Sequence, residues 1–178
     1  MITISAATAQ KPAIRLMRED DLEKVAEIDQ LSFSMPWSKR VYAYEIHDNQ
    51  NSLCWVAEIQ SPAGRRQVCG MIVTWIRLDE AHIATFAVHP DHRGKGLAKR
   101  MLKTALIAAI HHGTTQVILE VRSGNNIAQE LYQHFKFKEV GQRPRYYKDN
   151  NEDAIIMTIS GLGKEYLNWL STQAINFD

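Results

Sequence analysis

The sequence predicts a mixed α/β (α+β) domain in which a mostly antiparallel, twisted sheet is flanked by helices. Two observations lead to this prediction. Short apolar stretches of strand character recur along the 178 residues, and stretches with one apolar face at helical spacing lie between them. The expected order is a strand, two helices, three strands, a helix, a strand, a helix and two strands, which is typical of one sheet with helices packed on it.

The bulk properties fit a single domain. The length leaves room for one domain, and 45% hydrophobic residues can form a core. A formal net charge of +1 gives no overall attraction to nucleic acid or to an anionic membrane, and no apolar run is long enough to span a bilayer. We expect a cytoplasmic protein that binds neither, with its oligomeric state open. The expected divisions are a flexible tail over 1–12, a domain over 13–160, and an extension over 161–178 that holds a short helix.

The first half of the chain is expected to hold one strand, two helices and three strands. Asp20 caps the first helix, with Glu23 three residues later completing a capping box. The segment Ser34–Trp37 ends that helix, and Ser38 caps the next one, which continues to about His47. The expected strands are Ala13–Arg18, Leu53–Ile59, Val68–Arg77 and Ala81–Val88.

The second half is expected to hold two long helices, three strands and a short terminal helix. The clearest helix starts near Gly96 and stops at Gly113, a residue type that commonly ends helices. The other elements are strand Gln116–Val121, helix Asn125–Lys136, the paired strands Val140–Arg145 and Ala154–Ser160, and helix Leu162–Leu170. The inward residues expected on the Asn125 helix are Ile127, Ala128, Leu131 and Phe135.

The two cysteines, Cys54 and Cys69, lie in neighbouring expected strands. If these strands form an antiparallel hairpin, Cys54 lies opposite Val73 and Cys69 lies opposite Glu58. The thiols are then not cross-strand partners. Two buried free cysteines in a reducing compartment are therefore expected.

A glycine-rich, basic turn joins the strand Ala81–Val88 to the clearest helix. Glycines let backbone N–H groups converge, and the helix start adds free N–H groups and partial positive charge. The turn and helix start comprise Arg93, Gly94, Lys95, Gly96, Leu97, Ala98 and Lys99. The spacing matches neither a dinucleotide fingerprint nor a nucleoside-triphosphate P-loop. We favour a diphosphate site over the alternative of a solvated turn.

Glu120 is the chemically conspicuous residue of the strand Val117–Val121. Its neighbours are all apolar, and burying a carboxylate there is unfavourable unless it has a partner or a function. One possibility is an ion pair with Arg122 or another cation at the strand end. The other is a general base, in which case burial would raise the pKa of Glu120. The residues alone leave both open.

The turn Arg93-Gly94-Lys95-Gly96-Leu97-Ala98 matches the signature of the GNAT superfamily of N-acetyltransferases, and the chain resembles that family. More closely, it resembles the ribosomal-protein-alanine N-acetyltransferases, which acetylate protein N-termini. The matching pieces are Met35-Pro36-Trp37-Ser38, Phe86–Pro90, Leu119–Arg122, Asn125, Leu131-Tyr132, Tyr146-Tyr147 and Glu152–Met157, collinear over about 14–159. Gly124 and Lys136 depart from the family pattern, and Lys136 replaces a glycine that usually ends the helix.

The resemblance implies a GNAT fold, acetyl-CoA as cosubstrate and no metal. It implies that Glu120 is the general base for the acceptor amine and that Tyr132 is the acid for the departing thiolate. It also implies coenzyme contacts by Asn125 and Tyr132, and an oxyanion donor in the backbone N–H of Val88. The mechanism it implies is direct attack in a ternary complex, because neither cysteine lies in a motif.

The acceptor side is implied by two further segments. Met35, Pro36 and Trp37, together with Tyr146 and Tyr147, are expected to flank the groove for a protein N-terminus, with a ribosomal protein as the candidate acceptor and ordinary packing as the alternative. A small-molecule amine acetyltransferase and a non-catalytic acyl-CoA-binding module are the other functions considered. The histidines show no metal-binding spacing; those considered are His82, His89, His92, His111 and His112.

Overall fold

The structure is a computed structural model that describes residues 12–60 and 64–173. Its seven strands form one sheet in the order β1-β2-β3-β4-β5-β7-β6. Every neighbouring pair is antiparallel except β4 and β5, which are parallel. The mixed, mostly antiparallel sheet predicted from the sequence is confirmed. The tail expected over 1–12 lies outside the described residues except for its last residue.

All of the expected helices and strands are present, with ends shifted by a few residues. The strands are β1 (Ala13–Leu16), β2 (Ser52–Gln60), β3 (Arg66–Arg77), β4 (Glu80–Val88), β5 (Gln116–Arg122), β6 (Lys138–Tyr147) and β7 (Glu152–Ser160). The α-helices are α1 (Leu22–Ser32), α2 (Lys39–His47), α3 (Leu97–His111), α4 (Asn126–His134) and α5 (Lys164–Thr172). Short 3-10 turns, η1 (Glu19–Asp21) and η2 (Pro90–His92), precede α1 and α3. None of these described helices is long and apolar enough to cross a membrane.

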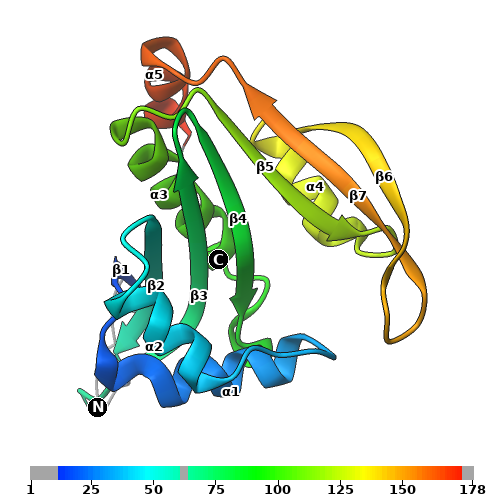
Figure 1. Cartoon of the computed structure of the whole chain (residues 1–178). Helices are drawn as coiled ribbons and strands as arrows, with labels where there is room; N and C mark the ends of the chain where they lie inside the picture. Colours follow the sequence, from blue (N-terminus) through cyan, green and yellow to red (C-terminus); the bar gives the residue numbers. More distant parts are fainter. Residues whose placement is uncertain (1–11, 61–63, 174–178) are drawn as a thin grey trace, which may run out of the picture.

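Helices cover both faces of the sheet and produce two hydrophobic cores (Figure 1). Helices α1 and α2 pack on one face, where Val25, Ile28 and Tyr42 are fully buried. Helices α3, α4 and α5 contribute to the core on the other face, together with Val117, Leu119 and Val121 of β5. Because side chains alternate along a strand, Glu120 lies on the face opposite to the α3 core.

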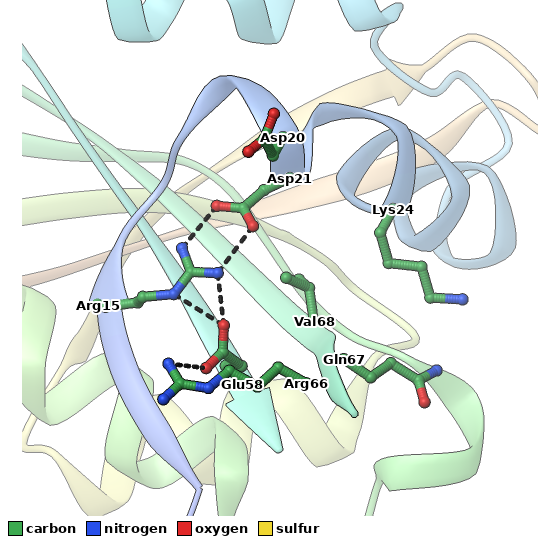
Figure 2. Close-up of a pocket in the computed structure, with 8 residues that line it drawn as sticks. All are labelled: Arg15, Asp20, Asp21, Lys24, Glu58, Arg66, Gln67 and Val68. Atoms are coloured by element: carbon green, nitrogen blue, oxygen red, sulfur yellow. Dashed lines mark hydrogen bonds and ion pairs between the residues drawn. The ribbon is translucent and has the colours of Figure 1, made fainter. Parts of the chain in front are cut away.

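The start of α1 corrects the expected cap. Asp21, rather than Asp20, is the N-cap residue, and its carboxylate accepts a hydrogen bond from the backbone N–H of Arg18 at 2.8 Å. Asp21 also binds Arg15, which binds Glu58 of β2 in turn (Figure 2). This long-range ion-pair cluster joins β1, β2 and the start of α1. It fixes Asp21 at the helix start, which the local capping pattern did not reveal.

A charged surface pocket surrounds this cluster. Figure 2 shows Arg15 lying between the carboxylates of Asp21 and Glu58, with Arg66 against the far oxygen of Glu58. The two carboxylates are buried and both are paired. The buried charges that line the pocket are therefore paired with one another. The pocket lies at the β1 edge of the sheet, far from β5.

Helix α4 is oriented largely as expected, because Ala128, Leu131 and Phe135 all contribute to the core. Ile127, expected to face inward, is 84% exposed, whereas Tyr132 and Phe135 are buried. The buried stripe is centred on these two aromatic residues, and Ile127 lies outside it. Lys136 adopts the left-handed φ of 69° that a glycine commonly provides after a helix. The backbone N–H of Phe137 then donates to the carbonyl of Tyr132 at 3.0 Å, which closes the helix end.

The C-terminal extension is part of the main core. The helix expected over Leu162–Leu170 is α5, and its Tyr166 and Leu170 are buried against the α3 side. The Tyr166 hydroxyl donates to the carbonyl of Phe135 at 2.8 Å. Lys136 Nζ lies 4.1 Å from the centre of the Trp169 ring. The extension therefore packs onto α3 and the end of α4.

Both cysteines are buried and free, as predicted. Cys54 lies opposite Val73, which confirms the expected pairing. The expected partner of Cys69 is wrong, because a β-bulge shifts the register so that Glu58 pairs with Val68. The Cys69 thiol donates instead to the carbonyl of Ala57 at 3.4 Å. Burial raises the pKa of each thiol to about 11, so neither is a nucleophile near neutral pH.

The parallel pair β4 and β5 separates soon after it begins. Only Glu80, Ala81 and His82 of β4 pair with β5, opposite the segment Gln116–Ile118. Beyond these pairs the strands diverge, with Val88 ending one arm and Arg122 ending the other (Figure 1). We call this divergence the β4–β5 fork. Beyond the fork point, the facing backbone N–H and C=O groups of β4 and β5 do not pair with each other.

Candidate active site

The basic glycine turn lies at the open end of the β4–β5 fork. Gly94 and Gly96 both adopt left-handed conformations, with φ of 76° and 71°. The first backbone bond within α3 runs from Arg100 N–H to the carbonyl of Gly96 at 3.2 Å. The N–H groups of Leu97, Ala98 and their neighbours therefore precede the helical bonding pattern. Free N–H groups at a helix start are suited to binding an anion.

The turn fits a diphosphate through its backbone more than through its charges. A Cβ built on Gly94 meets no atom within 4 Å, so the backbone there is open to a ligand. Arg93, by contrast, turns inward: its Nε donates to the carbonyl of Val88 at 2.9 Å and its Nη2 donates to Ser32 Oγ at 3.1 Å. Lys95 Nζ donates to the carbonyl of Asp91 at 2.9 Å. These side chains shape the turn and still provide positive charge.

The backbone of Val88 is oriented toward the fork. The next residue, His89, donates its N–H to the carbonyl of Cys69 in the neighbouring strand at 2.8 Å. Successive amides of a strand point to opposite edges, so the N–H of Val88 points away from β3 and toward β5. This direction is the one that an oxyanion donor in the fork requires.

Glu120 joins the two arms of the fork where they separate. Its Oε2 lies 2.7 Å from His82 Nε2 of β4, and its Oε1 lies 3.1 Å from Arg143 Nη2 of β6. The pair with Arg122 that the sequence left open is not formed, because Arg122 binds Asp149 instead, at 3.0 Å. Adjacent parallel strands place His82 beside Ile118, and Glu120 is the next residue of β5 on the same face. The carboxylate is thus held between two strands that have no backbone bonds at that level.

These partners reverse the expected direction of the Glu120 pKa. The hydrogen bond from His82 lowers the pKa of Glu120 most, and the charge of Arg143 lowers it further, while burial acts in the opposite direction. The net pKa lies below the ordinary value for glutamate. Burial alone predicted a rise, and that expectation is wrong because two donors face the carboxylate. Glu120 is therefore ionised at neutral pH and accepts hydrogen bonds through both oxygens.

Tyr132 lies on the α3 side of β5, in the core. Its ring packs 5.7 Å from that of Phe137, and burial raises the pKa of its phenol. Among the described residues, no direct contact joins Tyr132 to Glu120. Tyr147 interacts electrostatically with both Tyr132 and Glu120. Asn125 caps α4 through a hydrogen bond from the Ala128 N–H to its Oδ1 at 3.2 Å.

The α1–α2 loop is held by a buried carboxylate that the sequence did not single out. Asp29 is 1% exposed, accepts a hydrogen bond from the backbone N–H of Trp37, and is also hydrogen-bonded to the Tyr42 hydroxyl. Burial raises the pKa of Asp29 despite these bonds. The Trp37 ring stacks on Trp75 with centroids 6.0 Å apart, and Trp75 lies 5.6 Å from His82. An aromatic row therefore connects this loop to the partner of Glu120.

The β6–β7 hairpin faces the same loop. Tyr146 and Tyr147 are in edge-to-face contact at 5.2 Å, and the Arg122 guanidinium lies 3.9 Å from the centre of the Tyr147 ring. Ser34 Oγ of the α1–α2 loop donates to Asp149 Oδ2 at 2.6 Å. Arg122 thus ties the hairpin and the loop together. The two predicted acceptor segments lie on either side of the face that carries Glu120.

No sequence pattern indicated the contacts that Asp29, His82 and Arg143 make at the candidate site, and Arg122 was considered only as a partner of Glu120. Asp29 is one carboxylate among several on an amphipathic helix, and His82 was considered only as a metal ligand. Their roles depend on strand register and loop packing, which no local motif encodes. Within residues 12–60 and 64–173, no group of three metal-ligating side chains converges on one point.

The candidate site therefore combines a glycine-rich helix start at the open end of the strand fork with an ionised carboxylate at its closed end. The model of the acetyltransferase (GNAT) family matches residues 22–137. The chain belongs to this family and is an N-acetyltransferase.

Within that family the chain is similar to acetyltransferases that modify ribosomal proteins. A Bacillus subtilis protein, whose name proposes a ribosomal protein bS18-alanine N-acetyltransferase, is 35% identical over 150 residues, 84% of this chain and 96% of the relative. The ribosomal protein bS18-alanine N-acetyltransferase of Escherichia coli K12 is 30% identical over 148 residues, 82% and 95% of the two chains. The crystal structure of the E. coli ribosomal-protein-S18-alanine N-acetyltransferase superposes with a TM-score of 0.74 at 28% identity, covering 87% of this chain and 97% of that one.

Proposed function

We propose that this protein transfers the acetyl group of acetyl-CoA to the N-terminal α-amine of a protein, by direct attack in a ternary complex. The observation that carries the proposal is the carboxylate of Glu120, held where the β4–β5 fork opens, on the face of the sheet opposite to the α3 core. The relatives named for ribosomal protein bS18 support a ribosomal protein as the acceptor and the cytoplasm as the location.

The proposed coenzyme site runs along the fork. The diphosphate is bound by the turn and helix start, whose residues are Arg93, Gly94, Lys95, Gly96, Leu97, Ala98 and Lys99. Free N–H groups before Arg100 and the partial charge of the α3 dipole favour a dianionic group there. Asn125 and Tyr132 contact the coenzyme near its thioester end. The Val88 N–H donates to the thioester oxygen as negative charge develops on it.

The proposed chemistry uses one base and one acid. An α-ammonium with a pKa of about 8 must lose a proton before its nitrogen can attack. Glu120 accepts that proton, directly or through a water, while His82 holds its Oε2 in place. The amine nitrogen then bonds to the thioester carbon, and the carbon–sulfur bond breaks. Tyr132 donates its phenolic proton to the departing thiolate.

The proposed acceptor groove lies between the α1–α2 loop and the β6–β7 hairpin. Met35 is 66% exposed and Tyr146 is 40% exposed, so both offer apolar surface to a ligand. Pro36, Trp37 and Tyr147 complete the two walls. Such walls suit a short extended peptide, whose first residue brings its amine to Glu120.

The proposal is tested with a panel of acceptors in the presence of acetyl-CoA, with release of the coenzyme thiol as the readout. The panel contains short peptides with free N-termini, the same peptides with blocked N-termini, and polyamines. We expect turnover with the free peptides alone. Turnover with polyamines only would establish the small-molecule alternative, and no turnover with any amine would support a non-catalytic module.

The role of Glu120 is tested by the isosteric change Glu120→Gln. A positioned general base contributes about 10²- to 10⁴-fold, so we expect kcat to fall within that range. Acetyl-CoA affinity, measured by calorimetry, should stay constant because Glu120 is not in the proposed diphosphate site. Glu130→Gln, at an exposed glutamate of α4, is the matched control and should leave turnover unchanged. Wild-type turnover by the Glu120 variant would exclude it as the base.

A further inference from the structure

Both oxygens of Glu120 are already engaged in the protein without its acceptor. His82 takes Oε2, and the guanidinium of Arg143 takes Oε1 at 3.1 Å. The two partners differ in environment. The Arg143 side chain is 51% exposed, compared with 30% for His82 and 12% for Glu120. Arg143 is thus the solvent-side partner, on the face from which an acceptor reaches the carboxylate.

The strand that carries Arg143 allows its side chain to move. Strand β6 is an edge strand, and its pairing with β7 is irregular between Arg143 and Tyr147. Arg145, within this irregular stretch, has a left-handed φ of 49°, and its N–H donates to Asp153 Oδ1 at 2.7 Å. The Arg143 guanidinium already lies over the Tyr146 ring, 5.4 Å from its centre, so this cation–π contact can hold Arg143 when it leaves Glu120.

We propose that Arg143 is a positioning residue that occupies, before the acceptor binds, the place on Glu120 Oε1 that the acceptor's α-ammonium takes. The inference rests on the proposed function. A guanidinium and an α-ammonium are both cations that donate N–H groups to a carboxylate oxygen, so one replaces the other with the same polarity. Two cations side by side repel each other, so the arriving ammonium favours movement of Arg143 toward Tyr146.

Displacement of Arg143 also makes Glu120 available to the acceptor. The groups that face Glu120 are His82 from β4, Arg143 and Tyr147 from β6, and the apolar Ile156 opposite it on β7. Arg143 is one of two groups that lower the pKa of Glu120, and it is the one that can leave. Its departure leaves Oε1 free for the arriving ammonium, which pairs with Glu120 in its place until the proton is transferred. In the free enzyme it keeps a desolvated carboxylate paired, and it therefore competes with the acceptor.

The test is Arg143→Gln, with Arg143→Lys as the conservative variant and Arg145→Gln as the control on the same strand. An exposed ion pair of this type contributes a factor of about two to five. We expect the peptide-acceptor KM of Arg143→Gln to fall by about that factor while kcat stays constant, because Arg143 has already left in the ternary complex. The Lys variant should behave like the wild type. The pKa of Glu120, followed by carboxyl NMR in the protein without acceptor, should rise in the Gln variant only.

The possible outcomes separate this inference from the proposed function. An increase in KM for Arg143→Gln would show that Arg143 binds the acceptor, and would overturn the displacement. An unchanged Glu120 titration would show that the ion pair is absent in solution, with the same consequence. If the wild type acetylates no peptide, the proposed function fails, but the NMR titration still reports whether Arg143 holds Glu120. An equal shift in Arg145→Gln would reduce the effect to general surface charge and overturn the proposal.

Discussion

Gly70 of β3 lets α3 lie directly on the sheet, and its replacement by alanine tests whether this packing supports the fork. The residue is buried, and a Cβ built there would lie 2.7 Å from Met101 Sδ, 3.2 Å from the carbonyl oxygen of Ala87 and 3.5 Å from the Ala57 Cβ. The first contact requires α3 or its methionine to move. The second presses on the backbone just before Val88, which pairs with Gly70.

The size of the effect follows from these contacts. Overpacking by one methyl group in a tight core destabilises by about 1–3 kcal/mol. For a domain of this length each kcal/mol lowers Tm by about 2–4 °C, so we expect Gly70→Ala to melt about 2–12 °C lower than the wild type. Because the displaced atoms adjoin Val88 and α3, we also expect weaker acetyl-CoA binding. Scanning calorimetry and isothermal titration measure the two effects.

A double-mutant cycle shows whether Met101 is the cause. Met101→Ala alone leaves a cavity and is expected to destabilise by about 2–5 kcal/mol. In Gly70→Ala/Met101→Ala the new methyl group occupies part of that cavity, so the losses should fall short of additivity by more than about 0.5 kcal/mol. Gly163→Ala, where a Cβ meets no atom within 4 Å, is the matched control. Additive losses, or a Gly70→Ala protein that melts with the wild type, would refute the packing explanation.

Two other predictions concern pH and the end of α4. Because the pKa of Glu120 is lowered in the folded protein, its ionised carboxylate stabilises the fold above the ordinary glutamate pKa of 4.5, and this contribution is lost as the pH falls through the folded pKa. The free energies of unfolding of the wild type and Glu120→Gln, measured with urea, should therefore become equal in acid. By the same reasoning, kcat/KM between pH 5 and about 8 should follow the acceptor amine and show no step from Glu120. Lys136→Gly should change stability by less than about 0.5 kcal/mol, because relief of the left-handed backbone is offset by loss of the cation–π contact with Trp169. A gain of more than about 1 kcal/mol in urea unfolding would show that this contact contributes little.

The elements could be predicted from the sequence because their signals are local. Apolar spacing and glycine positions located every strand and helix, including α5. The errors arose where distant residues decide. Asp21 rather than Asp20 lies at the N-cap position of α1, where Arg15 of β1 binds it, and Ile127 is exposed although Ala128, Leu131 and Phe135 pack inward as expected.

The candidate site was predictable to the same extent. Glu120 is conspicuous within one apolar strand, and the glycine turn within one segment, so both could be identified from local patterns alone. Their surroundings could not. His82 meets Glu120 only because β4 and β5 are parallel in one register, and Arg143 meets it only through the order β5-β7-β6. The direction of the Glu120 pKa shift depends on these partners and therefore could not be predicted from the sequence.

The β4–β5 fork has a mechanical consequence. Among the described residues, the ladder between the β1–β4 part of the sheet and the β5–β7 part consists of three residue pairs, preceded by backbone bonds to the Asp79 carbonyl, and the His82–Glu120 contact lies at the last pair. In the proposed complex, the coenzyme lies between the separated strands β4 and β5. The bound coenzyme therefore bridges the two halves of the sheet. Binding of acetyl-CoA should then make the sheet more rigid, and release of CoA should make it more flexible. The rigidity of the sheet would therefore change with each turnover.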